Sequence, residues 1–121
     1  MRILLVEDEE NIRETLKLNL ELEGYEVVTV GDGKHVIKTF KDQHFDLILL
    51  DIMLPDVDGL QLCEQIRLLN TDIPIIFITA ISKDEQYVNQ AAEIGAVDYI
   101  FKPINSEILK SKVRTYLELY V

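Results

Sequence analysis

The strongest constraint in this sequence is a fivefold alternation of short apolar runs with longer amphipathic segments. The apolar runs are typical of buried β-strands, whereas the amphipathic segments carry apolar residues at helical spacing. Strict alternation with short links favours a parallel sheet that is covered by helices on both faces. The sequence therefore predicts a single α/β domain over residues 1–121, built on a doubly wound, five-stranded parallel sheet with five helices.

The expected elements can be placed by residue number. Strands are expected over residues 2–6, 26–30, 45–50, 73–79 and 98–101. Helices are expected over residues 9–23, around 36–40, and over 60–70, 84–94 and 106–120. Gly24 and Gly95 follow the first and fourth helices, where glycine commonly ends a helix because it tolerates a left-handed backbone.

Composition narrows the classes of function. The net charge of −10 would repel nucleic acid phosphates, so direct binding of DNA or RNA by this domain is not expected. The apolar runs are too short to span a membrane, and no membrane partner is expected. The chain contains one cysteine, Cys63, and turns acidic at Glu7 instead of continuing as a secretory signal. We therefore expect a cytoplasmic protein.

Polar side chains of complementary chemistry stand at the ends of the predicted strands. Glu7 and Asp8 follow the first strand and Asp51 follows the third. Thr79 ends the fourth strand and Lys102 follows the fifth. The carboxyl ends of parallel strands share one edge, and open α/β sheets bind their ligands at that edge. These residues are therefore expected to converge although no continuous motif contains them.

The chemistry of this set indicates phosphoryl transfer. Crowded carboxylates oppose one another's ionisation, and a divalent cation with a preference for oxygen ligands, such as Mg²⁺, removes that conflict. A lysine ammonium suits phosphate oxygens, and a threonine hydroxyl can donate a further hydrogen bond. In such a site Asp51 would be the nucleophile that becomes an aspartyl phosphate.

Four segments, taken in their order along the chain, resemble the receiver domain of response regulators, the phosphoacceptor of two-component signalling. They are VEDE at 6–9, LLDIMLPDVDG at 49–59, ITA at 78–80 and GAVDYIFKP at 95–103. The resemblance covers essentially the whole chain. It implies a flavodoxin-like fold with strand order 2-1-3-4-5, an order for which a receiver is itself a standard example.

The resemblance implies a role for each residue at the strand ends. Asp51 matches the phosphorylated aspartate. Glu7, where many receivers have Asp, and Asp8 match the acidic pair that holds Mg²⁺, together with Asp51 and the backbone carbonyl of Met53. The remaining roles fall on Thr79 and Lys102, which would bind phosphoryl oxygens, and on Tyr99, which matches the aromatic switch residue that responds together with Thr79.

The resemblance also implies two properties of the site. The peptide bond between Lys102 and Pro103 is expected to be cis, as receivers use a cis bond here to aim the lysine. The phosphorylated state is expected to be long-lived, because Met53 and Ile81 border the approach of water in line with the phosphorus and neither can orient a water molecule.

The expected partners follow from the same family. A sensor histidine kinase would be the phosphodonor, and an output domain or effector protein would receive the signal, with homodimerisation on phosphorylation as a further expectation. The domain would catalyse its own phosphorylation and dephosphorylation and no metabolic reaction. The chain ends at Val121 in an apolar helical pattern, so we expect it to be a piece of a longer protein. Receivers with this kind of ending resemble those that continue into kinase, cyclase or phosphohydrolase modules. The alternative is a stand-alone receiver.

Two other functions compete with the signalling switch. A Mg²⁺-dependent phosphohydrolase also uses an aspartyl nucleophile, but such enzymes resemble one another in a second aspartate two residues later, where this chain has Met53. A flavin-binding electron carrier of similar topology would need a phosphate-binding loop after the first strand. This chain has four consecutive acids there, residues 7–10, which would repel a phosphate.

Overall fold

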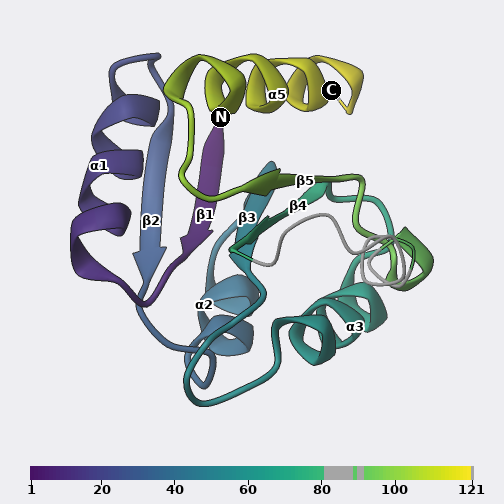
Figure 1. Cartoon of the computed structure of the whole chain (residues 1–121). Coiled ribbons are helices and arrows are strands. Elements are labelled where there is room, and N and C mark those ends of the chain that lie inside the picture. The colour runs from purple at the N-terminus through teal and green to yellow at the C-terminus, as the bar shows by residue number, and fades with distance from the viewer. Residues whose placement is uncertain (81–88, 90–91, 121) are drawn as a thin grey trace.

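The computed structural model describes residues 1–80, 89 and 92–120, and it contains one five-stranded sheet (Figure 1). The strands are β1 (Arg2–Val6), β2 (Glu26–Val30), β3 (Leu47–Asp51), β4 (Ile75–Thr79) and β5 (Asp98–Phe101). They are parallel and ordered β2-β1-β3-β4-β5, which confirms the expected order. All five carboxyl ends therefore lie along one edge of the sheet.

Helices cover both faces of the sheet. The described helices are α1 (Glu10–Glu21), α2 (Val36–Asp42), α3 (Gly59–Leu69) and α5 (Ser106–Leu119). Figure 1 shows α1 and α5 on one face, and α2 and α3 on the other. The helix expected over residues 84–94 lies largely outside the described residues, although residues 92–94 are helical. Within the described ranges, no helix has the length and apolar character needed to cross a membrane.

The core forms two layers, one on each face of the sheet, because successive strand residues point to opposite sides. On β1, Leu4 packs into the layer beneath α2 and α3, whereas Leu5 packs into the layer beneath α1 and α5. All five residues of β3 and of β4 are buried. Burying one such side chain stabilises the fold by about 1.5–3 kcal/mol, so the apolar runs hold the central strands in place.

Two strands begin later than the sequence predicts. The third strand begins at Leu47 instead of residue 45, although Phe45 is buried. The fourth begins at Ile75 instead of residue 73, because the side chain of Asn70 accepts the backbone N–H group of Ile73 and holds it in a turn. Apolar character alone does not separate a buried turn residue from a strand residue.

Candidate functional site

The sheet places the acidic residues, the threonine and the lysine expected at the site along its carboxyl edge. Glu7 and Asp8 follow the last residue of β1, and Asp51 is the last residue of β3. Thr79 is the last residue of β4, and Lys102 follows the last residue of β5. Since β1 and β3 are neighbours in the sheet, the residues that follow them meet at the point where the chain changes direction across the sheet.

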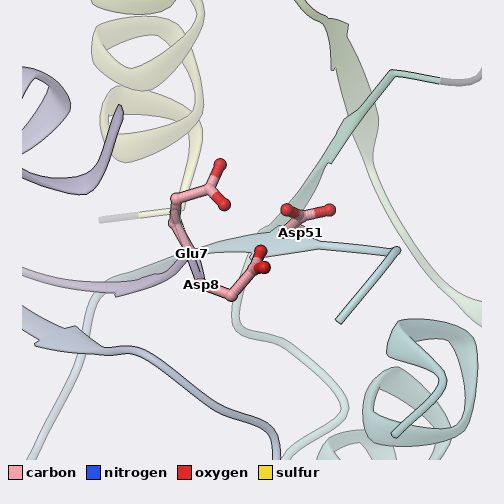
Figure 2. A group of neighbouring side chains, drawn as sticks. All are labelled: Glu7, Asp8 and Asp51. Carbon is pink, nitrogen blue, oxygen red and sulfur yellow. The ribbon is translucent and has the colours of Figure 1, made fainter. Parts of the chain in front are cut away.

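Three carboxyl groups gather at this point. Figure 2 shows Glu7, Asp8 and Asp51 directed toward a common space. One carboxylate oxygen of each lies within 4.8 Å of the others. Glu7 is completely buried and Asp51 is 2% exposed, whereas Asp8 is exposed. The cluster is therefore open to solvent on the side of Asp8 and enclosed on the side of Glu7.

Lys102 neutralises part of this charge. Its Nζ donates a hydrogen bond of 3.0 Å to Asp51 Oδ2 and lies 2.8 Å from Glu7 Oε1 as an ion pair. The backbone N–H group of Met53 donates to Asp51 Oδ1 at 2.9 Å. Both oxygens of Asp51 are thus held by donors, which fixes the direction of its carboxylate.

Glu7 is less well satisfied than Asp51. Its Oε2 accepts the backbone N–H group of Glu9 at 3.2 Å. Its Oε1 is buried and, among the described residues, receives the charge of Lys102 but no aligned hydrogen bond. Burial raises the pKa of Glu7 to about 7, an increase that Lys102 opposes and Asp51 reinforces. Burial alone would lower the pKa of Lys102, but its bonds to Glu7 and Asp51 hold that pKa above its ordinary value.

This arrangement fits a divalent cation. Three carboxylates face one ammonium, so the site carries excess negative charge when all three are ionised. An under-coordinated, buried oxygen of Glu7 and an exposed carboxylate of Asp8 supply hard oxygen ligands of the kind that Mg²⁺ prefers. Several water molecules could complete the coordination from the solvent side.

The other expected residues lie on β4, on β5 and in the loop that follows β3. Thr79 is buried, and its backbone carbonyl accepts the N–H group of Lys102 at 2.8 Å. The side chain of Met53 is 57% exposed next to the acidic cluster. Tyr99 is half-buried on β5, with its ring edge-on to Phe101 at 5.1 Å between centroids. The peptide bond between Lys102 and Pro103 is cis, as predicted.

Two further features of the site leave no recognisable pattern in the sequence. Gly59 lies so close to the β3–α3 loop that a Cβ atom would stand 2.5 Å from Cα of Ile52 and 2.7 Å from the carbonyl oxygen of Asp51. A glycine in a turn suggests a bend, but not this close approach. Arg13 on α1 donates to the backbone carbonyls of Glu7 and Asp8, although its place in an amphipathic pattern is that of an ordinary surface charge.

Known proteins of similar sequence are regulators. A family profile described as response regulator receiver domain matches residues 3–114. The alkaline phosphatase synthesis transcriptional regulatory protein PhoP of Bacillus subtilis is 40% identical over 117 residues, covering 96% of this chain and 48% of that protein. The transcriptional regulatory protein AfsQ1 of Streptomyces coelicolor is 40% identical over 116 residues, covering 95% of this chain and 50% of that protein. The chain thus spans about half the length of these relatives.

Solved structures that resemble this fold are also response regulators. A two-component response regulator from Clostridium difficile has a TM-score of 0.92 at 35% identity, over 98% of this chain and 96% of that one. The response regulator TrrA from Thermotoga maritima, solved in complex with Mg²⁺-BeF, has a TM-score of 0.85 at 39% identity, over 95% of this chain and 97% of that one. The profile match over nearly the whole chain, on the expected fold, shows that this protein belongs to the family of response regulator receiver domains, the phosphorylation-activated switches of two-component systems.

Proposed function

We propose that Asp51 of this receiver domain accepts a phosphoryl group from a sensor histidine kinase in a reaction that requires Mg²⁺. The observation that carries this proposal is the carboxylate of Asp51, which is almost completely buried at the carboxyl edge of the sheet and held between Lys102 and the backbone of Met53. A nucleophile held in this way is aligned before the phosphodonor arrives.

The transfer exchanges one bond to phosphorus for another. An oxygen of Asp51 forms a bond to the phosphorus, and the bond between phosphorus and the imidazole nitrogen of the kinase histidine breaks, leaving the electron pair on nitrogen. Lys102 stands within hydrogen-bonding reach of Asp51 and would bind an oxygen of the incoming group. The hydroxyl of Thr79, at the end of the next strand, would bind another.

A magnesium ion would be held by the carboxylates of Glu7, Asp8 and Asp51 and by the backbone carbonyl of Met53. It would supply positive charge against the oxygens of the phosphoryl group during transfer. The unsatisfied, buried Oε1 of Glu7 supports this assignment. So does the similarity to TrrA, which was crystallised with Mg²⁺-BeF.

The signal would pass to an output domain or an effector protein. The relatives described above are transcriptional regulators about twice as long as this chain, which supports an output on transcription. They give no support to the expectation of a kinase, cyclase or phosphohydrolase output. The chemistry that this domain catalyses would be limited to its own phosphorylation and dephosphorylation.

Acetyl phosphate and Mg²⁺ provide the test, because a small phosphodonor needs no cognate kinase. The wild-type protein should gain the mass of one phosphoryl group, and Asp51→Asn should gain none, since the amide keeps the shape and removes the nucleophile. Asp42→Asn is the matched control, because Asp42 is an exposed aspartate at the end of α2 and does not belong to the acidic cluster. Phosphorylation of Asp51→Asn at the wild-type stoichiometry, or rapid turnover of unrelated phosphate esters by the wild type, would overturn the proposal.

A further inference from the structure

Arg13 connects α1 to the backbone of the acidic loop. Its Nη1 donates to the carbonyl oxygen of Glu7 at 3.0 Å and to that of Asp8 at 3.4 Å. These are the two acids that follow β1, and the guanidinium contacts their main chain, not their carboxylates. The same loop is held from the other side, where the N–H group of Glu7 donates to the carbonyl of Val30 at the end of β2. Figure 1 shows this loop beside the end of β2.

Gly31 leaves room for the guanidinium. A Cβ atom at this position would stand 2.8 Å from Arg13 Nη1 and 3.5 Å from its Cζ, with no atom outside the Arg13 side chain among the nearest contacts. The backbone of Gly31 does not adopt the left-handed conformation that favours glycine, unlike that of Gly24 and Gly95. A side chain at position 31 would therefore require the guanidinium of Arg13 to shift, whereas the backbone conformation there does not itself require glycine.

We propose that Arg13 is a positioning residue for the metal site, and that Gly31 supports this role by leaving space for the guanidinium. The arginine fixes the main chain from which the carboxylates of Glu7 and Asp8 project, and so keeps them directed toward Asp51 in the metal-free protein. This inference rests on the proposed function, since it concerns the Mg²⁺ site described there.

The direction of the change in Mg²⁺ affinity distinguishes a positioning role of Arg13 from a purely electrostatic one. A guanidinium near the cluster repels a divalent cation, so removing its charge alone would strengthen Mg²⁺ binding. Removing a group that orients the ligands weakens metal binding, typically by about 10–100-fold. A loss of affinity in a variant without Arg13 can therefore come only from positioning, because the change in charge acts in the opposite direction.

The first experiment titrates the unphosphorylated protein with Mg²⁺ alone, by calorimetry, with thermal unfolding as a check that each variant folds. Arg13→Ala should bind Mg²⁺ about tenfold more weakly than the wild type. Lys17→Ala is the matched control, since Lys17 lies one turn later on α1 and its side chain makes no hydrogen bond or ion pair within the described ranges. It should bind Mg²⁺ as tightly as the wild type or slightly more tightly. Unchanged or tighter binding by Arg13→Ala would overturn the proposal.

The second experiment approaches the same contact from Gly31. Gly31→Ala should weaken Mg²⁺ binding in the wild-type background, because the new methyl group displaces the guanidinium, and should change nothing when added to Arg13→Ala. An equal loss in both backgrounds would show that Gly31 acts independently of Arg13, contrary to the proposal. Asp8→Ala distinguishes a failure of the proposed metal site from a failure of the role of Arg13. If this variant binds Mg²⁺ as well as the wild type, the metal site itself is wrong. If it abolishes binding while Arg13→Ala does not weaken it, only the role of Arg13 fails.

Discussion

Glu7 is a completely buried carboxyl group whose charged neighbours are the carboxyl groups of Asp8 and Asp51 and the ammonium of Lys102. Its charged form is disfavoured by burial and by Asp51, and Lys102 compensates only in part, so the pKa lies near 7 instead of 4.5. A folded protein that keeps this group ionised does so at a cost in stability. That cost fits a residue selected to bind a cation more than one selected to hold the fold together.

The pH dependence of stability should reveal this cost in metal-free buffer. Between pH 4.5 and about 7 the folded protein holds a proton on Glu7 that the unfolded chain has released. The contribution of Glu7 to stability therefore falls as the pH rises through this window, by up to about 1.4 kcal/mol per pH unit, and is constant above it. Urea unfolding of the wild type and of Glu7→Gln from pH 4.5 to 8.5 measures the difference.

The difference in unfolding free energy between the two proteins reports on Glu7 alone, because all other titrating groups are common to both. Glu7→Gln should gain stability relative to the wild type as the pH rises. Glu10→Gln is the control, since Glu10 is exposed at the start of α1, and should show no such trend. Parallel pH profiles for the wild type and Glu7→Gln would contradict the perturbed ionisation of Glu7.

Met53 provides a second prediction at the scale of one residue. Its side chain is largely exposed two residues after Asp51, and it can neither donate to nor accept a strong hydrogen bond from an attacking water. The phosphorylated protein should therefore lose phosphate slowly. Met53→Asn should shorten the lifetime, and a double variant with Ile81→Glu, at a position outside the described residues, should shorten it further. Timed loss of radiolabelled phosphate measures this, and a double variant no faster than the parent would refute it.

At the scale of the elements, Arg67 joins the end of α3 to the turn before β4 and to a turn 28 residues later in the chain. It lies in the last turn of α3, and its guanidinium donates to the carbonyl oxygens of Ile73 at 2.6 Å, Gly95 at 2.6 and 3.1 Å, and Asn70 at 3.3 Å. These carbonyls belong to the turn before β4 and to the turn that leads toward β5. The end of one helix and the start of two strands thus depend on one side chain.

Removal of this side chain should destabilise the fold without touching the acidic cluster. Arg67→Ala should lower the free energy of unfolding by about 2–3 kcal/mol, since it deprives partly buried carbonyls of charged donors. Arg67→Lys should recover little, because one ammonium cannot replace a planar fork that reaches several carbonyls. Urea unfolding gives the measurement. The exposed Arg114→Ala should change stability by less than about 0.5 kcal/mol, and an equal effect of both variants would argue against the role of Arg67.

The elements themselves could be predicted from the sequence, but such contacts could not. Strands buried on both faces leave continuous apolar runs and helices with one apolar stripe leave a periodic pattern, so the order of the elements and the sheet edge follow from local sequence. Glu7, Asp51 and Lys102 could be predicted to meet because each stands at a strand end. Arg13 and Arg67 leave no such pattern. In an amphipathic helix, an arginine that hydrogen-bonds to a carbonyl of another segment occupies the same positions as one that points to solvent.

At the scale of the whole molecule, the proposed phosphorylation site and β5 belong to one sheet. Lys102 follows β5 and contacts Asp51, whereas Tyr99 lies three residues earlier on the same strand. Lys112 of α5 secures this face: its Nζ donates to Asp98 Oδ1 and to the carbonyl of Tyr99, both at 3.0 Å, and lies 5.7 Å from the centre of the Tyr99 ring. A change at Asp51 therefore has a short route to Tyr99.

Phosphorylation should turn the half-buried ring of Tyr99 inward. Beryllofluoride with Mg²⁺, as a phosphoryl mimic, should shift the Tyr99 signal in fluorine NMR of protein labelled with fluorotyrosine, with the signal assigned by Tyr99→Phe. Asp51→Asn should show no shift, because the amide lacks the carboxylate oxygen that the beryllium would bind, and a ligand that does not bind cannot move a conformational equilibrium. An unchanged Tyr99 signal in wild-type protein that binds the mimic, as judged by a raised unfolding temperature, would exclude this coupling.

Lys112 should influence the equilibrium between the two positions of the Tyr99 ring in the unphosphorylated protein. A cation over an aromatic ring at a partly exposed site stabilises that arrangement by about 0.5–1 kcal/mol. Lys112→Met keeps the aliphatic stem and removes this attraction, so the unloaded protein should populate the inward ring about two- to fivefold more than the wild type. Lys110→Met is the matched control, since the Lys110 ammonium pairs only loosely with Glu107, at 3.8 Å. If both variants leave the unloaded Tyr99 signal unchanged, Lys112 does not hold the ring, and its edge-on contact with Phe101 and its packing against the core layer set its position.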